Sequence, residues 1–126
     1  MVEFALVAPF FFILLFGVME MGRLVWTNHE LANGTREAAR LVIVRGSEWN
    51  KTGTAATPAD VKQRIIDTTT GLSEGALSID IAPGLGGDPG TSVTITATYQ
   101  YDVLIGIIPG LSDFTMSHAS TVIIQH

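Results

Sequence analysis

Apolar residues dominate the start of this chain without the alternation of a strand. Residues 4–19 carry no charge and include five phenylalanines, whereas residues 46–88 mix Thr, Gly, Asp and Glu. A helix over residues 4–19 would be about 24 Å long, against roughly 30 Å of bilayer hydrocarbon. It can continue to Trp26, because Glu20 and Arg23 can pair three residues apart and Trp suits a headgroup boundary. The run is apolar on all faces, which favours lipid or a filament core over burial in a soluble protein.

A signal peptide is the ordinary alternative for an N-terminal apolar run. Here no basic region precedes the run and no small-x-small cleavage site follows it. The arginines at 23, 36, 40 and 45 all follow the run, so the positive-inside rule places its carboxyl side in the cytoplasm. Export of the remaining chain would therefore require a basic leader that has been cleaved from the amino end.

Two residues in this region are unusual for a lipid-facing helix. Glu3 has no cation near it in sequence except the chain's amino terminus, so its carboxylate is expected in the headgroup layer or paired with a positive group of another molecule. Pro9 lacks a backbone N–H and is expected to bend or break the helix near residues 5–9.

Helical periodicity continues beyond the apolar run. Apolar residues recur at roughly helical spacing as far as residue 44, and Gly46 is expected to end the helix. A helix over residues 2–45 would be on the order of 66 Å long. Residues 20–45 are then interpreted as a stalk that holds a globular part away from the apolar segment. Close helix packing is favoured by a stripe of small residues, namely Ala32, Gly34, Ala38 and Ala39.

The second half of the chain predicts one short helix and three strands. Thr57 followed by Pro58 is a favourable helix start, and an apolar face follows until Gly71. Alternating apolar and polar residues then predict strands over 77–82, 93–103 and 114–124. The expected fold class is α+β: a long N-terminal transmembrane helix (1–46), then a domain (47–126) with a short helix on an antiparallel sheet of about three strands.

Composition narrows the function. The 126 residues are 47% hydrophobic and 15% charged, with a net charge of −5. The acidic balance argues against nucleic-acid binding, which needs a basic surface. The absence of cysteine excludes a disulfide framework, a thiol nucleophile and Cys-type zinc sites.

Candidate chemistry is sparse, and the sequence predicts neither an enzyme nor a bound cofactor or metal. The histidines at 29, 118 and 126 have no metal-ligand or catalytic spacing. The aspartates at 80, 88, 102 and 113 lack the ordered spacing of a calcium loop. Two sequons are present. Asn33 falls inside a predicted helix, whereas Asn50 lies in a predicted loop with an acidic residue two positions earlier and is the better N-glycosylation candidate.

Three motifs occur in order along the first 45 residues: Val-Glu-Phe-Ala-Leu-Val from Val2, Gly-x-x-Glu-x-Gly-Arg from Gly17, and an Ala- and Arg-rich helix from Thr35. In these motifs the chain resembles the TadE-like family, pilins and pseudopilins of the tight-adherence (Tad) branch of type IV pili. The resemblance implies a type IV pilin-like fold and a basic leader removed by a prepilin peptidase. It also implies that Glu3 neutralises the amino terminus of an adjacent subunit, although the usual pattern has that glutamate as the fifth mature residue.

The resemblance implies a structural filament subunit that sits first in the inner membrane and later in a cell-surface filament. Its partners would be copies of itself, the membrane, the peptidase and the pilus assembly machinery. A minor pseudopilin of that machinery and a single-pass membrane-anchored binding module are the alternatives. The residues expected to act in assembly are Glu3, Phe4, Pro9, Phe10, Phe11, Phe12, Leu15, Phe16, Glu20 and Arg23.

Overall fold

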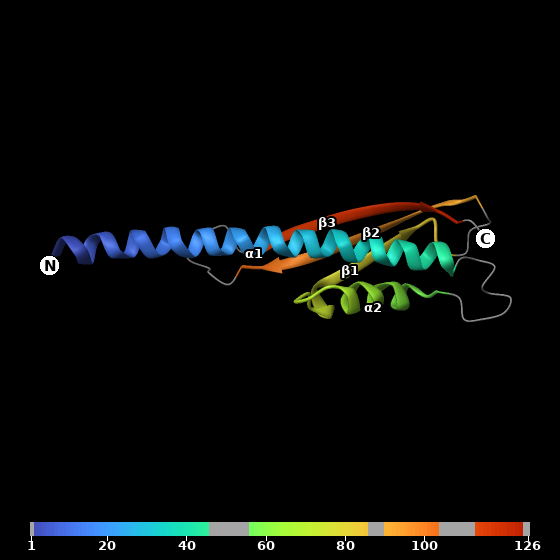
Figure 1. Ribbon diagram of the computed structural model, residues 1–126, viewed down its shortest axis with the longest axis horizontal. Coiled ribbons are helices and arrows are strands. Elements are labelled where there is room, and N and C mark those ends of the chain that lie inside the picture. The colour runs from blue at the N-terminus through green and yellow to red at the C-terminus, as the bar shows by residue number, and fades with distance from the viewer. Residues whose placement is uncertain (1, 46–55, 86–89, 104–112, 125–126) are drawn as a thin grey trace.

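The computed structural model describes residues 2–45, 56–85, 90–103 and 113–124. A long helix comes first, followed by a short helix, one 3₁₀ turn and three strands (Figure 1). These elements are α1 (Val2–Val44), α2 (Pro58–Thr68), η2 (Glu74–Ala76), β1 (Leu77–Ala82), β2 (Ser92–Asp102) and β3 (Asp113–Ile123). The predicted α+β, pilin-like fold class is confirmed, and each predicted strand lies within one residue of its observed bounds.

The sheet has the order β1-β2-β3, with both pairs antiparallel. Alternate residues of β2 from Val93 to Tyr101 are buried, and the residues between them are half-buried or exposed. This alternation turns one face of the sheet toward the helices and leaves the other, rich in Thr and Ser, in solvent. Sequence periodicity was sufficient to place these strands, because successive side chains of a strand point to opposite faces and only one face of this sheet is buried.

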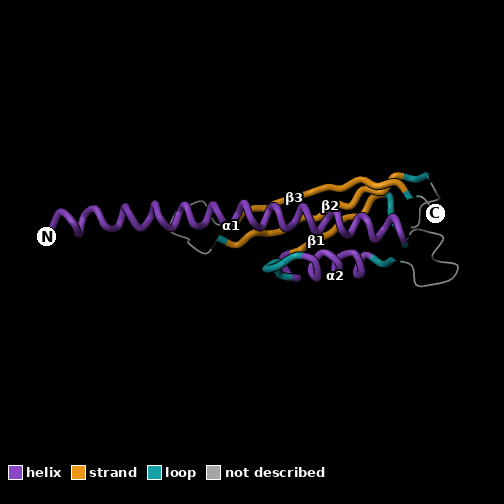
Figure 2. Tube along the Cα trace, in the orientation of Figure 1, coloured by secondary structure: helices purple, strands orange, loops and turns teal. Residues whose placement is uncertain are grey.

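The second half of α1 belongs to the same core as the sheet. Leu31, Ala38 and Val42 are fully or almost fully buried in one hydrophobic cluster with residues of α2, β2 and β3. Figure 2 shows the sheet and α2 running beside this half, while the first half projects alone. The interpretation of residues 20–45 as a stalk is therefore wrong for residues 27–42. Their small side chains allow the sheet and α2 to approach α1 closely, so this part is a wall of the domain.

Helix α2 is fixed at both ends. Its N-cap Thr57 forms a capping box, in which the Thr57 hydroxyl accepts from the Asp60 N–H at 3.2 Å and the Asp60 carboxylate accepts from the Thr57 N–H at 2.8 Å. The bond from the Thr57 N–H, together with a second one that the Thr57 hydroxyl donates to the same carboxylate at 2.8 Å, holds the pKa of the Asp60 carboxyl below its usual value. The helix ends at Thr68, earlier than the predicted Gly71, because Thr69 adopts an extended backbone as C-cap.

Helix α1 continues through Pro9 without interruption from Val2 to Val44. The predicted local break at Pro9 is therefore wrong. Proline removes one N–H donor and leaves one carbonyl of the preceding turn without its intrahelical partner, but the turns on either side keep their bonds. One missing bond in so long a helix does not end it.

Candidate assembly surface and the junction beneath the sheet

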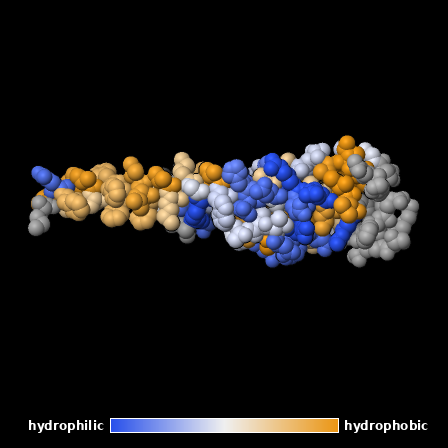
Figure 3. Space-filling model, in the orientation of Figure 1, coloured by the Kyte–Doolittle hydropathy of each residue, from blue (hydrophilic) through white to orange (hydrophobic). Residues whose placement is uncertain are grey.

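The first half of α1 makes no core with the rest of the described chain. None of its most apolar 18-residue window is buried, and by length and composition α1 is the one helix among the described residues that could cross a membrane. Figure 3 shows this half as a continuous hydrophobic rod beside a mixed, largely polar body. Thirteen large apolar side chains are exposed on it: Val2, Phe4, Leu6, Val7, Phe10, Phe11, Phe12, Ile13, Leu14, Leu15, Phe16, Val18 and Met19.

The free energy attached to this surface is large compared with the stability of a domain. Full burial of one such side chain is worth about 1.5–3 kcal/mol, so thirteen give on the order of 20–40 kcal/mol before partial shielding along the helix is allowed for. A folded domain of this size is stable by only about 5–15 kcal/mol. The rod therefore requires an apolar partner, either lipid or protein.

The predicted assembly residues lie all around this rod rather than on one stripe. Phe12 and Phe16 stack one turn apart with ring centroids 6.3 Å from each other, and Phe11 packs edge-on to Phe12 at 5.9 Å. Phe4, Phe10 and Leu15 are also exposed. Glu3 is exposed in the first turn of α1. Met1 lies outside the described residues, so pairing between Glu3 and an amino terminus stays a prediction.

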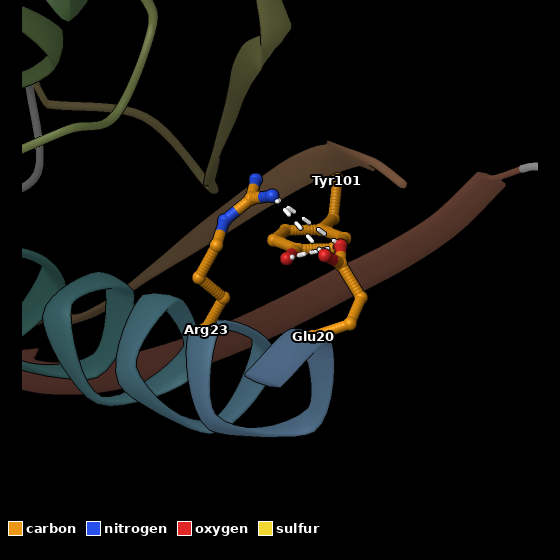
Figure 4. A network of polar contacts seen from close by, with 3 residues as sticks. All are labelled: Glu20, Arg23 and Tyr101. Atoms are coloured by element: carbon orange, nitrogen blue, oxygen red, sulfur yellow. Dashed lines mark hydrogen bonds and ion pairs between the residues drawn. The ribbon is translucent and has the colours of Figure 1, made fainter. Parts of the chain in front are cut away.

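A polar junction ties α1 to the end of the sheet. Glu20 and Arg23 lie one turn apart, with Arg23 Nη1 3.3 Å from Glu20 Oε2. The Tyr101 hydroxyl, at the end of β2, donates to Glu20 Oε1 at 2.8 Å. The Arg23 guanidinium carbon lies 5.1 Å from the centre of the Tyr101 ring, a cation–π arrangement. In Figure 4 the two side chains of α1 reach toward the tyrosine from the facing strand.

The junction changes the chemistry of Tyr101. The residue is 2% exposed. Burial, reinforced by the hydrogen bond to the Glu20 carboxylate, raises the pKa of the Tyr101 hydroxyl to about 12, while Arg23 opposes the rise. The hydroxyl therefore remains a hydrogen-bond donor throughout the physiological range.

The predicted pair of Glu20 and Arg23 is confirmed, but its partner Tyr101 was missed. The pair follows from i, i+3 spacing on a helix. Tyr101 is 81 residues further along the chain, and only the docking of the sheet on α1 brings it there. The one usable signal was its place at the end of an alternating strand, on the core-facing side.

The family model for TadE-like protein matches residues 1–40, which span the exposed rod, the Glu20–Arg23 pair and most of the buried half of α1. The match covers 40 of the 126 residues, so it makes this segment similar to TadE-like proteins. TadE-like proteins are generally non-enzymatic and associated with pili. No curated protein and no solved structure is significantly similar to the chain.

Within the TadE-like segment, the sequon at Asn33 is obstructed by the fold. Asn33 is exposed, but Thr35 is fully buried and its hydroxyl donates to the Leu31 carbonyl at 2.6 Å. A glycosylation site needs an accessible Thr hydroxyl two residues after the Asn, so this sequon is closed in the folded helix. Asn50 lies outside the described residues, and its modification stays a prediction.

The remaining polar side chains form no site for chemistry among the described residues. No set of three or more His, Asp or Glu side chains in the described ranges could hold a metal ion. Near the C-terminal end of α1, Glu37 pairs with Arg64 of α2 at 3.0 Å and with Arg40 at 3.7 Å. These residues line an open hollow of about 300 Å³. The pairs are solvent-exposed and contribute at most about 1 kcal/mol each.

Proposed function

We propose that this chain is a structural subunit, a pilin, of a Tad-type extracellular filament. The observation that carries the proposal is the apolar first half of α1, whose most apolar window has no buried residue, in a segment that matches the TadE-like family model. A helix that is apolar on every side fits a position where it is surrounded, first by acyl chains and later by the same helix of neighbouring subunits. Assembly then exchanges lipid contacts for helix–helix contacts without exposing the rod to water.

The rigid construction of α1 supports this role. One unbroken helix forms both the rod and a wall of the sheet domain. Force or packing on the rod is therefore transmitted to the domain through a continuous set of backbone hydrogen bonds and a shared core. In a filament the rods form the centre and the sheet domains face outward, with their Thr- and Ser-rich faces toward solvent.

Each assembly residue has a specific role in this proposal. The phenylalanines from 4 to 16 and Leu15 fill the filament core. Glu3 pairs with a positive group on an adjacent subunit and sets the register between neighbours, because an unpaired carboxylate among apolar helices is costly. Pro9, with its one unpaired carbonyl nearby, is a local weak point in a continuous helix. Before assembly the subunit spans the inner membrane, and its further partners are a prepilin peptidase and the pilus assembly machinery.

Electron microscopy of material sheared from cells, with amino-terminal sequencing of the subunit, tests the proposal. Uniform filaments made of this chain are expected. Glu3→Gln should lower filament yield strongly, while Glu74→Gln, at an exposed carboxylate in η2 of the sheet domain, should leave it unchanged. A chain found only as a monomer in the inner membrane would contradict the pilin role. Its presence at substoichiometric amounts in filaments of another chain would instead identify a minor pseudopilin.

A further inference from the structure

Helix α1 divides into three zones along its length. Residues 2–19 are exposed, residues 27–42 contribute side chains to the core, and between them lies a short zone that the end of the sheet touches. Tyr101 reaches this zone through its bond to Glu20, and Phe114 is the register partner of Tyr101 on β3. The base of the sheet is therefore level with residues 20–26 of α1.

The lengths of these zones match a bilayer. Residues 2–19 span about 27 Å as a helix, close to the roughly 30 Å of the hydrocarbon core. The next seven residues, 20–26, add about 10 Å, comparable to one headgroup layer. A rod that fills the hydrocarbon therefore brings the base of the sheet to the depth of the headgroups.

The side chains at this level are those that an interface favours. We call the exposed side chains at this level, Met21, Arg23, Trp26 and Phe114, the collar. Trp26 is 48% exposed and Phe114 38%, and the Trp26 ring packs beside Gly71, where an added Cβ would lie 3.4 Å from Cζ3 of the ring. The Arg23 side chain is 36% exposed, whereas that of its partner Glu20 is only 15% exposed. Arg23 is therefore the more accessible residue of the pair, and its guanidinium can reach the phosphate of a lipid headgroup.

We propose that the collar is a seat for phospholipid headgroups, on which the base of the sheet rests before the subunit is assembled. This inference rests on the membrane stage of the proposed function. Trp26 and Phe114 lie among the glycerol and headgroup atoms, and Arg23 donates to lipid phosphate. The seat fixes how deeply α1 is inserted and keeps the sheet domain from tilting freely about the rod.

The chain contains no cysteine, so single labelling sites can be introduced cleanly. Thr115→Cys and Ile123→Cys both place a label on the exposed face of β3, one at the base and one about 27 Å away. Each full-length variant carries a fluorescent maleimide and is reconstituted in phosphatidylethanolamine–phosphatidylglycerol vesicles. A nitroxide on the lipid headgroup should quench the label at position 115 several-fold more than the label at position 123. Equal quenching of the two labels would overturn the seat.

Intrinsic fluorescence gives a second, label-free measurement. In a Trp49→Phe variant the emission comes from Trp26, which should be quenched more by a headgroup nitroxide than by one deep in the acyl chain. Stronger quenching by the deep nitroxide would overturn the proposal. The proposal is also wrong if the fluorescence of the label at position 115 changes with the protein-to-lipid ratio but not with the headgroup nitroxide. A second copy of the chain would then cover the collar.

These outcomes are separable from those of the filament test. Filaments made of the chain together with unquenched probes would remove the headgroup seat and leave the pilin role intact. Quenched probes in a chain that never enters a filament would keep the seat and remove the pilin role.

Discussion

Gly34 is the position where a single methyl group tests the packing of α1 against α2. A Cβ added there would lie 2.7 Å from Cγ2 of Thr69 and 2.9 Å from Cγ2 of Ile65. Both methyl groups belong to β-branched, buried residues. Thr69 cannot rotate freely, since its hydroxyl donates to the Ile65 carbonyl at 2.7 Å. The added methyl group must therefore push the two helices apart or break that bond.

The magnitudes decide the sign of the effect. Overpacking of this kind costs about 1–3 kcal/mol, and loss of the Thr69 bond would add about 1 kcal/mol. The higher helix propensity of Ala offsets about 1 kcal/mol of this loss in stability. Gly34→Ala should therefore lower the free energy of unfolding by about 1–3 kcal/mol. The matched control is Gly22→Ala in the same helix, where nothing lies within 4 Å of the new Cβ. This variant should be neutral or more stable by up to about 1 kcal/mol.

Thermal unfolding of the full-length chain in detergent micelles, followed by near-ultraviolet circular dichroism, measures the difference. The aromatic signal of Tyr99 and Tyr101 reports the sheet domain rather than the helix content. A gap of about 1–4 kcal/mol between the two variants corresponds to a Tm difference on the order of 10 °C. If Gly34→Ala melts at or above the temperature of Gly22→Ala, the close contact between α1 and α2 is not what the structure indicates.

Three further predictions concern the junction and the sequon. Tyr101→Phe should lower the free energy of unfolding by about 1.5 kcal/mol, because it removes a hydrogen-bond donor to a carboxylate. Tyr99→Phe should lower it less, because the Tyr99 hydroxyl accepts only a 3.4 Å bond from the Ser73 N–H. Similar melting temperatures for the two variants would contradict this. The raised pKa of Tyr101 means that its contribution to stability is complete below pH 10 and is lost as the pH rises through about 12. Spectrophotometric titration at 295 nm should show one tyrosine ionising near pH 12 in the folded chain. In Glu20→Gln the pKa of Tyr101 should fall yet stay above 10, because burial is the larger cause of the shift. A Tyr101 pKa near 10 in the wild-type chain would refute the buried contact with Glu20. Coexpression with a bacterial oligosaccharyltransferase should leave the Asn33 peptide unmodified in mass spectrometry, and a glycan there would show that modification precedes folding.

The sequence predicted those elements whose causes are local. A few neighbouring residues were enough to predict three of these elements: the phenylalanine-rich run, the Thr57–Pro58 start of α2 and the alternating strand β2. The pair of Glu20 and Arg23 was equally accessible, because both residues lie on one helix. Pro9 was misjudged, since the local rule for proline omits how much helix on either side resists a break.

Residues 27–42 show where sequence reasoning stopped. Small side chains at 34, 38 and 39 indicate that something packs closely, but not what. Only the fold shows that α2 crosses at Gly34, where Thr69 and Ile65 leave no room for a Cβ, and that the sheet covers the same half of the helix.

By itself the sequence determined that one half of the long helix is apolar on every side and needs a partner, because the hydrophobic pattern of a helix is read within single turns. Only the tertiary structure decided where the rod ends and the domain begins. That boundary depends on Tyr101 reaching Glu20 across 81 residues of chain, and a contact of this kind exists only after the sheet has formed and docked. The physical reason is that hydrophobic periodicity in the sequence shows which face of a helix or strand is buried, whereas the residues that cover that face are known only from the folded structure.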